Sequence, residues 1–87
     1  MEANVKGLTE GRIVHYVLDS GRSQGEHRPA IVVRAWRGEA PHDDLVQLQV
    51  FTDQTNDGFD TGIIWRTSVH FADQDKAPGS WHWIEQA

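Results

Sequence analysis

Short runs of hydrophobic residues alternate with polar segments that contain glycine or proline along all 87 residues of the chain. The clearest run is 45–52, in which Val46, Leu48 and Val50 alternate with two glutamines. Because successive side chains of a strand point to opposite faces, this alternation predicts a strand with one core face and one polar face. No segment has the 3.6-residue hydrophobic period of an amphipathic helix, so the pattern predicts an all-β protein.

Four further segments complete the set of predicted strands. Runs rich in β-branched and aromatic residues occupy 11–18, 30–36 and 63–71, the last with a bend at Thr67–Ser68, and a short strand follows at 80–84. Turn-forming residues fill the segments between them, including 19–29 and 53–58. Five short strands predict a small SH3-like barrel, with an OB-like barrel or a small sandwich as alternatives. Residues 1–10 are predicted to be an N-terminal extension, and 11–87 the single barrel domain.

Size and composition restrict the function classes. A chain of this length buries only about 60–65% of its unfolded surface, and it has no cysteine for disulfides, so we expect a homo-oligomer. The N-terminus lacks an apolar signal region and no hydrophobic run approaches the roughly 20 residues that span a bilayer, which predicts a cytoplasmic protein without a membrane partner. The net charge of −5 argues against duplex nucleic acid as a partner.

Catalytic and metal-binding motifs are absent from the sequence. Ser68 and His70 are the only close pair of a nucleophile and a histidine, and no glycines flank Ser68 as a nucleophile elbow requires. The five histidines show no HxH or HxxxH spacing, so no metal is predicted, although a three-histidine site assembled in space stays open. His15 and His82 are expected to be half-buried strand residues. We predict no cofactor and no enzymatic activity, with a nucleotide hydrolase as the alternative.

Tryptophan and arginine side chains are the remaining candidates for ligand binding. Trp81 and Trp83 would share one face of the last strand, with His82 on the other. If Ile31 and Val33 face the core, Arg34 and Trp36 project from the barrel as a cation–aromatic surface. Such residues either stack a planar ligand and bind its phosphate, or fill a core or a subunit interface. The candidate ligand-binding residues are Tyr16, Arg34, Trp36, Asn56, Trp65, His70, Trp81, His82 and Trp83.

Several strings in the chain resemble a widespread family of small uncharacterised proteins of tailed phages and prophages. They are GRIVHYVL (11–18), RPAIVVRAW (28–36), VQLQVFTD (46–53), Asn56–Asp57, the segment 65–69 and PGSWHW (78–83), so the resemblance covers nearly all of 11–85. Some small phage β-proteins act as sponges, oligomers that hold nucleotide immune signals without cleaving them. By this analogy, the resemblance implies a non-enzymatic counter-defence protein that sequesters a small anionic nucleotide-like ligand in the host cytosol. The alternative is a protein-interaction module, or a phage accessory or assembly factor, that uses its Trp-rich face.

Overall fold

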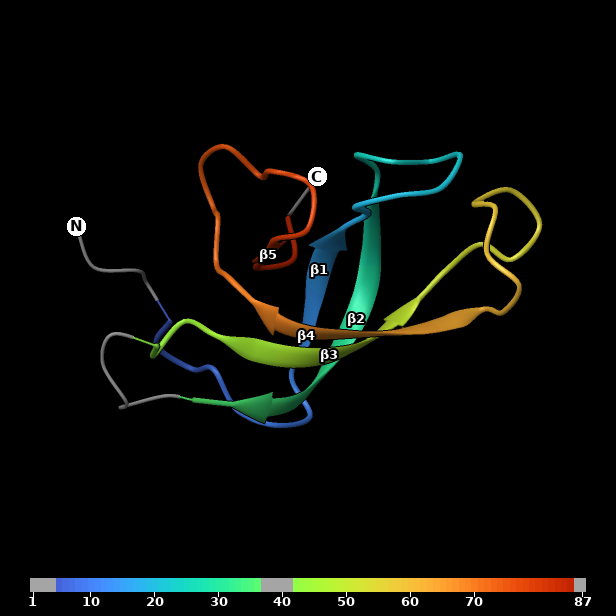
Figure 1. Cartoon of the computed structure of the whole chain (residues 1–87). Coiled ribbons are helices and arrows are strands. Elements are labelled where there is room, and N and C mark those ends of the chain that lie inside the picture. The colour runs from blue at the N-terminus through green and yellow to red at the C-terminus, as the bar shows by residue number, and fades with distance from the viewer. Residues whose placement is uncertain (1–4, 37–41, 86–87) are drawn as a thin grey trace.

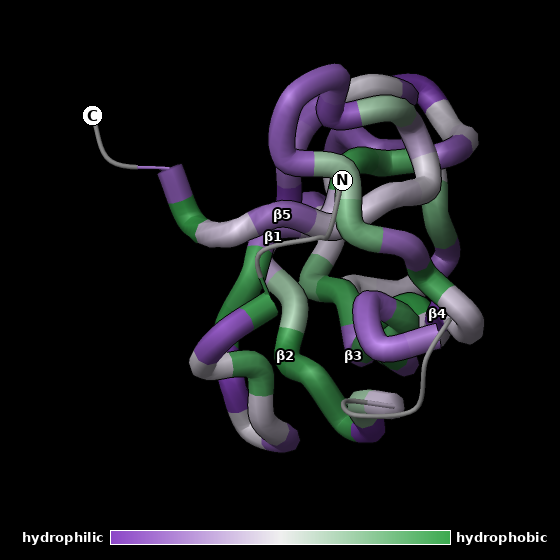
Figure 2. Tube along the Cα trace, turned by 90° about the vertical axis from the view of Figure 1, so that its left-hand side faces the viewer, coloured by the Kyte–Doolittle hydropathy of each residue, from purple (hydrophilic) through white to green (hydrophobic). Residues whose placement is uncertain are grey.

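The computed structural model describes residues 5–36 and 42–85 of the chain (Figure 1). This part contains five β-strands and no helix. In chain order the strands are β1 (Ile13–Val17), β2 (His27–Ala35), β3 (Val46–Phe51), β4 (Ile63–Val69) and β5 (Trp81–His82). They form one sheet in the order β4-β3-β2-β1-β5, and all neighbouring pairs are antiparallel. Figure 2 shows the labelled strands following one another in this order. The prediction of a five-stranded all-β fold is confirmed.

The sheet wraps around its core like a barrel, but it does not close. Beyond β4 the chain reaches β5, where Phe71 forms an isolated bridge with Trp81. At this point the Trp81 N–H donates to the His70 carbonyl over 2.9 Å, and the Ala72 N–H donates to the Trp81 carbonyl over 2.9 Å. The two edge strands are therefore joined by a short contact rather than by a continuous ladder, which leaves a small barrel-like sheet with an opening.

The core lies on the face of the sheet that the alternation in β3 selects. Val46, Leu48 and Val50 are all fully buried, as predicted. Their pairing places Ala30 and Val32 of β2 in the core with them.

The condition that Ile31 and Val33 face the core does not hold, because the β2–β3 register sets the opposite face. Ile31 pairs with the exposed Gln49, and Val33 is 46% exposed. The register between β2 and β3 shifts between Val32 and Arg34, which makes Val33 the extra residue of a β-bulge. Arg34 beyond the bulge is exposed, as expected.

A second bulge bends β4 where the sequence predicted a bend. Leu48 pairs with Arg66, and Val46 pairs with Val69. The chain thus advances three residues on β4 while it advances two on β3, which leaves one extra residue on β4. Within this stretch Ser68 has a positive φ of 52°, a left-handed backbone conformation that is uncommon for residues other than glycine. The bulge returns Val69 to the core, where it is buried.

Residues ahead of β1 also belong to the packed structure. Leu8 is buried in the core, and Val5 packs against it. The Gly11 N–H donates to the Val32 carbonyl over 2.7 Å, which fixes the entry into β1. The part of the predicted 1–10 extension that the structure describes, 5–10, therefore packs on the sheet. The described part of the chain has no helix with the length and hydrophobicity that crossing a bilayer requires.

A partly buried ion pair holds the 53–58 turn against β2. Asp57 is fully buried, and its two carboxylate oxygens accept hydrogen bonds from Arg28 Nη2 at 2.7 Å and Nε at 2.8 Å. The Asp53 N–H donates to the same carboxylate over 2.8 Å. The Arg28 guanidinium holds the pKa of the Asp57 carboxyl far below its usual range. The Arg28–Asp57 ion pair therefore fixes the position of the turn.

Candidate functional site

Two of the predicted ligand-binding residues lie in the core. Tyr16 and Trp81 pair across β1 and β5, and both are almost fully buried. The Trp81 ring packs 4.7 Å from the Phe71 ring, and its Nε1–H donates to the Asp44 carbonyl over 2.8 Å. The indole of Trp81 is therefore covered by the chain itself and has the polar partner that a buried tryptophan requires.

Five others lie on different elements. Arg34 stacks over Trp36 at the end of β2, with 4.7 Å between the guanidinium carbon and the ring centroid. Trp65 lies on β4 and is 43% exposed. Asn56 donates to Asp53 within the 53–58 turn, and His70 follows β4 with its Nδ1 3.2 Å from Asp44 Oδ2. The structure thus brings Arg34 and Trp36 together and places Trp65, Asn56 and His70 elsewhere.

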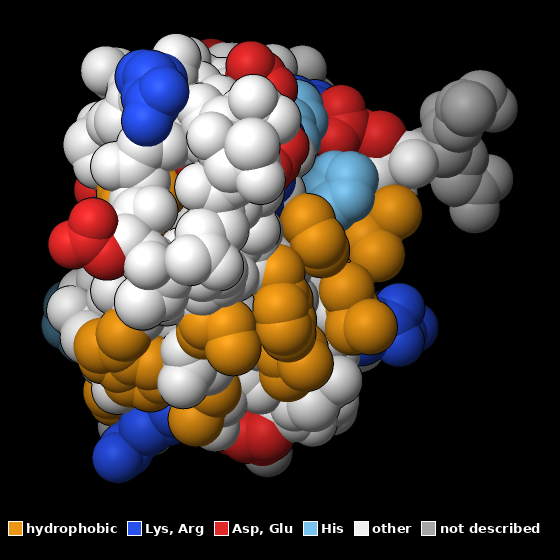
Figure 3. Space-filling view, turned by 90° about the vertical axis from the view of Figure 1, so that its right-hand side faces the viewer, with side chains coloured by type: hydrophobic (Ala, Val, Ile, Leu, Met, Phe, Trp, Pro, Cys, Tyr) orange, Lys and Arg blue, Asp and Glu red, His pale blue; other side chains and the backbone are white. Residues whose placement is uncertain are grey.

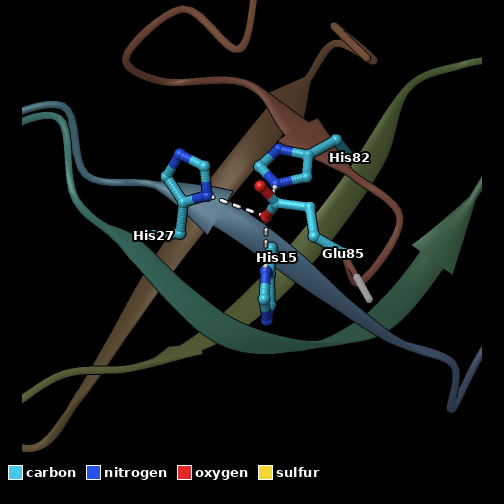
Figure 4. Close-up of side chains that lie close together, drawn as sticks. All are labelled: His15, His27, His82 and Glu85. Atoms are coloured by element: carbon cyan, nitrogen blue, oxygen red, sulfur yellow. Dashed lines mark hydrogen bonds and ion pairs between the residues drawn. The ribbon is translucent and has the colours of Figure 1, made fainter. Parts of the chain in front are cut away.

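The eighth residue, His82, belongs to a group that we call the histidine–glutamate cluster: His15, His27, His82 and Glu85 (Figure 4). His15 and His82 are cross-strand partners on β1 and β5, and His27 begins β2 next to them. His15 and His82 lie on the face opposite the core, because their strand neighbours Tyr16 and Trp81 point into it. His27 shares this face, because it pairs with Val17, which lies two residues from His15 on β1. The three rings contact one another edge-on, with centroids 4.6–6.2 Å apart.

One carboxylate oxygen joins the three histidines. Oε1 of Glu85 lies 3.0 Å from His15 Nδ1, 2.9 Å from His27 Nδ1 and 2.6 Å from His82 Nε2. These three imidazoles, His15 first, lower the pKa of the Glu85 carboxyl to about 2. The ionised carboxylate only accepts hydrogen bonds, so each ring nitrogen that faces it carries a hydrogen.

His82 is the buried member of the cluster. Its side chain is fully buried, which corrects the prediction of a half-buried residue, whereas His15 is half-buried as predicted. The rings of His15 and His27 and the Glu85 carboxylate contact it. Burial lowers the pKa of His82 below its usual value, and Glu85 offsets part of this effect. The other ring nitrogen of His82, Nδ1, has no hydrogen-bond partner among the described residues.

A groove lies beside the cluster. It has a volume of about 500 Å³ and is lined by Gly11, Arg12, Ile13, Trp83 and Ile84. The guanidinium of Arg12 lies 5.4 Å from the centroid of the Trp83 ring, within the range of a cation–π contact. Trp83 packs edge-on against Trp81, with 5.1 Å between the ring centroids, and keeps part of its own surface exposed. We call this feature the Arg12–Trp83 groove.

Sequence reasoning missed most of these neighbours. It assigned His27 to the 19–29 loop, whereas β2 begins at this residue. Glu85 and Arg12 were not considered for a site. One signal was available: His15 alternates with Tyr16, and His82 with Trp81, so pairing the first strand with the last puts both histidines on one face.

The cluster and the groove offer different chemistry to a ligand. The cluster presents nitrogen and oxygen donor atoms, three of them on paired strands. The groove presents an indole and an exposed guanidinium, a combination that suits a planar anion. Comparison of the chain with models of known protein families, with curated proteins and with solved structures finds no match in any of the three.

Proposed function

We propose that the protein binds a small nucleotide-type ligand in the Arg12–Trp83 groove and sequesters it without chemical change. The observation that carries the proposal is the stack of Arg12 over Trp83 along a groove of about 500 Å³. This volume falls within the roughly 300–1,000 Å³ of small-molecule sites. An indole offers a stacking surface for any base, and a guanidinium is well suited to a phosphate.

The ion pairs of two other arginines favour this location over theirs. Arg28 is held by Asp57 and Glu26, and Arg66 by Asp19, so these guanidinium groups already have anionic partners. Arg12 instead lies exposed at the groove with its charge beside an aromatic ring. A chain with a net charge of −5 would bind an anion through such a local cation rather than through its overall field.

The ligand class that we propose is an anti-phage nucleotide signal. The resemblance of residues 11–85 to small phage proteins supports this class. We further expect the working form to be a homo-oligomer, which light scattering coupled to gel filtration would test. A monomer at micromolar concentration would contradict that part of the proposal.

The test is retention and release of nucleotides. The protein is incubated with a panel of cyclic and linear nucleotides, and the solution is chromatographed before and after heat denaturation. We expect one nucleotide to disappear and to return intact after denaturation. A chemically altered nucleotide would instead favour the hydrolase alternative, and retention of none at micromolar protein would overturn the proposal.

Two tryptophan variants test whether the ligand binds in the Arg12–Trp83 groove. Replacing Trp83→Ala should weaken binding by about 1–3 kcal/mol, roughly 5- to 150-fold, because one stacking surface is lost. Trp36→Ala is the matched control, since Trp36 also pairs with an arginine but lies outside the groove. Equal losses in the two variants would contradict the groove as the site.

A second candidate function is favoured by the outer surface of the molecule. Figure 3 shows hydrophobic side chains in a broad band beside the histidines. Large hydrophobic side chains that are 39–50% exposed include Ile13, Val33, Phe51, Ile63, Trp65 and Ile84. Contiguous exposed apolar surface is typical of protein-interaction sites. Pull-down of a partner that Trp65→Ser abolishes, with no nucleotide retained, would favour an interaction module.

A further inference from the structure

We propose that His15, His27, His82 and Glu85 form a binding site for a divalent transition metal ion, with zinc as the preferred ion. The four ligand atoms lie within 4.8 Å of one another. They come from β1, β2, β5 and the segment after β5, so the folded sheet is required to assemble them. The site shares no residue with the proposed nucleotide groove, and the proposal does not rest on nucleotide binding.

The distances are close to those of a tetrahedral site. Zinc binds imidazole nitrogen at about 2.0–2.1 Å, which places neighbouring ligand atoms roughly 3.3 Å apart. The three ring nitrogens already surround one point, because all three lie 2.6–3.0 Å from Glu85 Oε1 (Figure 4). Movements on the order of 1 Å would bring the four atoms around an ion.

The present hydrogen bonding is crowded at that point. Three N–H groups converge on one carboxylate oxygen, which has about two lone-pair sites. A cation between the four ligands would replace this crowded contact with direct bonds. Glu85 is free to move from the centre to one corner, because its side chain is 44% exposed and it follows the last strand. The backbone of the histidines stays on the paired strands, and their rings move toward the ion by the same small distance, on the order of 1 Å.

Each imidazole binds the ion in its neutral form. Its hydrogen then lies on the ring nitrogen that faces away from the ion. For His15 and His27 the hydrogen moves from Nδ1 to Nε2, and for His82 from Nε2 to Nδ1. His82 Nδ1 has no hydrogen-bond partner among the described residues, so no existing hydrogen bond is lost there.

The donor set selects the kind of metal. Three imidazoles and one carboxylate suit zinc, copper or nickel, whereas calcium and magnesium prefer oxygen ligands throughout. Four protein ligands fill the tetrahedral positions of zinc, which is the arrangement of structural zinc sites. We therefore expect the ion to stabilise the junction of β1, β2 and β5 rather than to activate water.

The experiment uses the full chain after treatment with a chelator. Zinc titration by calorimetry should show one ion per chain, and cobalt should give the visible absorption of a four-coordinate centre. In ¹⁵N spectra, zinc should shift the ring signals of His15, His27 and His82 and leave those of His42 and His70 unchanged. A zinc-bound protein should also melt at a higher temperature than the metal-free protein.

A variant and its control complete the test. His27→Gln should lower zinc affinity by more than the roughly 10–100-fold that loss of an outer-sphere partner costs. We choose His27 because its side chain is 30% exposed, and circular dichroism checks that the variant folds. His42→Gln, at an exposed histidine outside the cluster, should bind zinc as the wild type does. If His27→Gln does not fold, Glu85→Gln takes its place.

Three results would overturn the proposal. The first is a wild-type protein that binds no zinc at micromolar concentration. The second is a folded cluster variant with unchanged affinity, and the third is zinc-induced shifts at His42 and His70 but not at the cluster. In each case the cluster would serve only to hold Glu85 against the sheet by hydrogen bonds.

Discussion

Trp81 and His82 are neighbours on a two-residue strand, yet they lie in environments of opposite character. The Trp81 side chain packs in the apolar core, and its one polar atom donates to the Asp44 carbonyl over 2.8 Å. The His82 side chain is equally buried, but it lies among two other histidines and a carboxylate, and one of its nitrogens has no partner among the described residues. Their cross-strand partners on β1, Tyr16 and His15, repeat the same contrast.

The two faces of the β1–β5 pair therefore have different roles. Burying an aromatic ring with a satisfied hydrogen bond stabilises the fold, whereas burying an imidazole with an unpartnered nitrogen costs free energy. Polar groups that are buried at a cost and converge on one point are typical of functional sites. The core face of β5 is therefore expected to determine stability, and the outer face to determine ligand binding.

The largest expected effect comes from the core face. Trp81→Ala should lower the free energy of unfolding by about 3–5 kcal/mol, because it removes a fully buried ring and leaves a cavity. Urea denaturation followed by circular dichroism measures the loss. Trp65→Ala is the matched control: Trp65 is 43% exposed, and its replacement should cost far less. Similar losses in the two variants would contradict the assignment of Trp81 to the core.

A second expected effect is a change in stability with pH that arises from Asp57, a carboxylate that supports the fold. Asp57, unlike Glu85, is fully buried and bound to a permanently charged arginine. Because its pKa is lower in the folded than in the unfolded protein, the unfolded chain binds the proton first as the pH falls. The stabilisation is fully present above the unfolded pKa of about 3.9 and is lost as the pH falls below it.

Asp57→Asn removes this pH-dependent contribution. We expect the variant to be less stable at neutral pH and to lose less further stability below about pH 4 than the wild type, as measured by urea midpoints across the pH range. Glu85→Gln is the comparison variant, since Glu85 also has a lowered pKa but is partly exposed. The same dependence on pH in Asp57→Asn and in the wild type would show that Arg28 does not set the charge of Asp57.

The sequence was sufficient to predict the strands but not all the faces they present. Alternation in β3 identified the core residues Val46, Leu48 and Val50, because each lies on a regular strand. In β2 the same reasoning could not select the core face, since the run of β-branched residues contains no clear alternation and a bulge at Val33 interrupts it. Which face of such a strand is buried depends on the neighbouring strand and its register. The local sequence pattern does not identify either.

The candidate site depended on long-range pairing to a greater degree. His15 and Glu85 are 70 positions apart, and no local spacing relates them. They meet because β1 lies between β2 and β5, a topology that composition and periodicity leave undetermined. The two tryptophans of PGSWHW lie in different environments for the same reason. Trp81 is buried by the chain, whereas Trp83 lies beside Arg12.

The smallest expected effect on stability comes from the other residue of β5. His82→Leu should change the free energy of unfolding by less than about 1 kcal/mol, because an apolar side chain removes the unpartnered nitrogen as well as one hydrogen bond. Glu85 keeps two imidazole donors and contact with solvent. The same variant should lose the zinc affinity proposed for the cluster, as calorimetry would measure. A destabilisation as large as that of Trp81→Ala would show that His82 supports the fold in the same way as its neighbour, and the contrast between the two faces would then be lost.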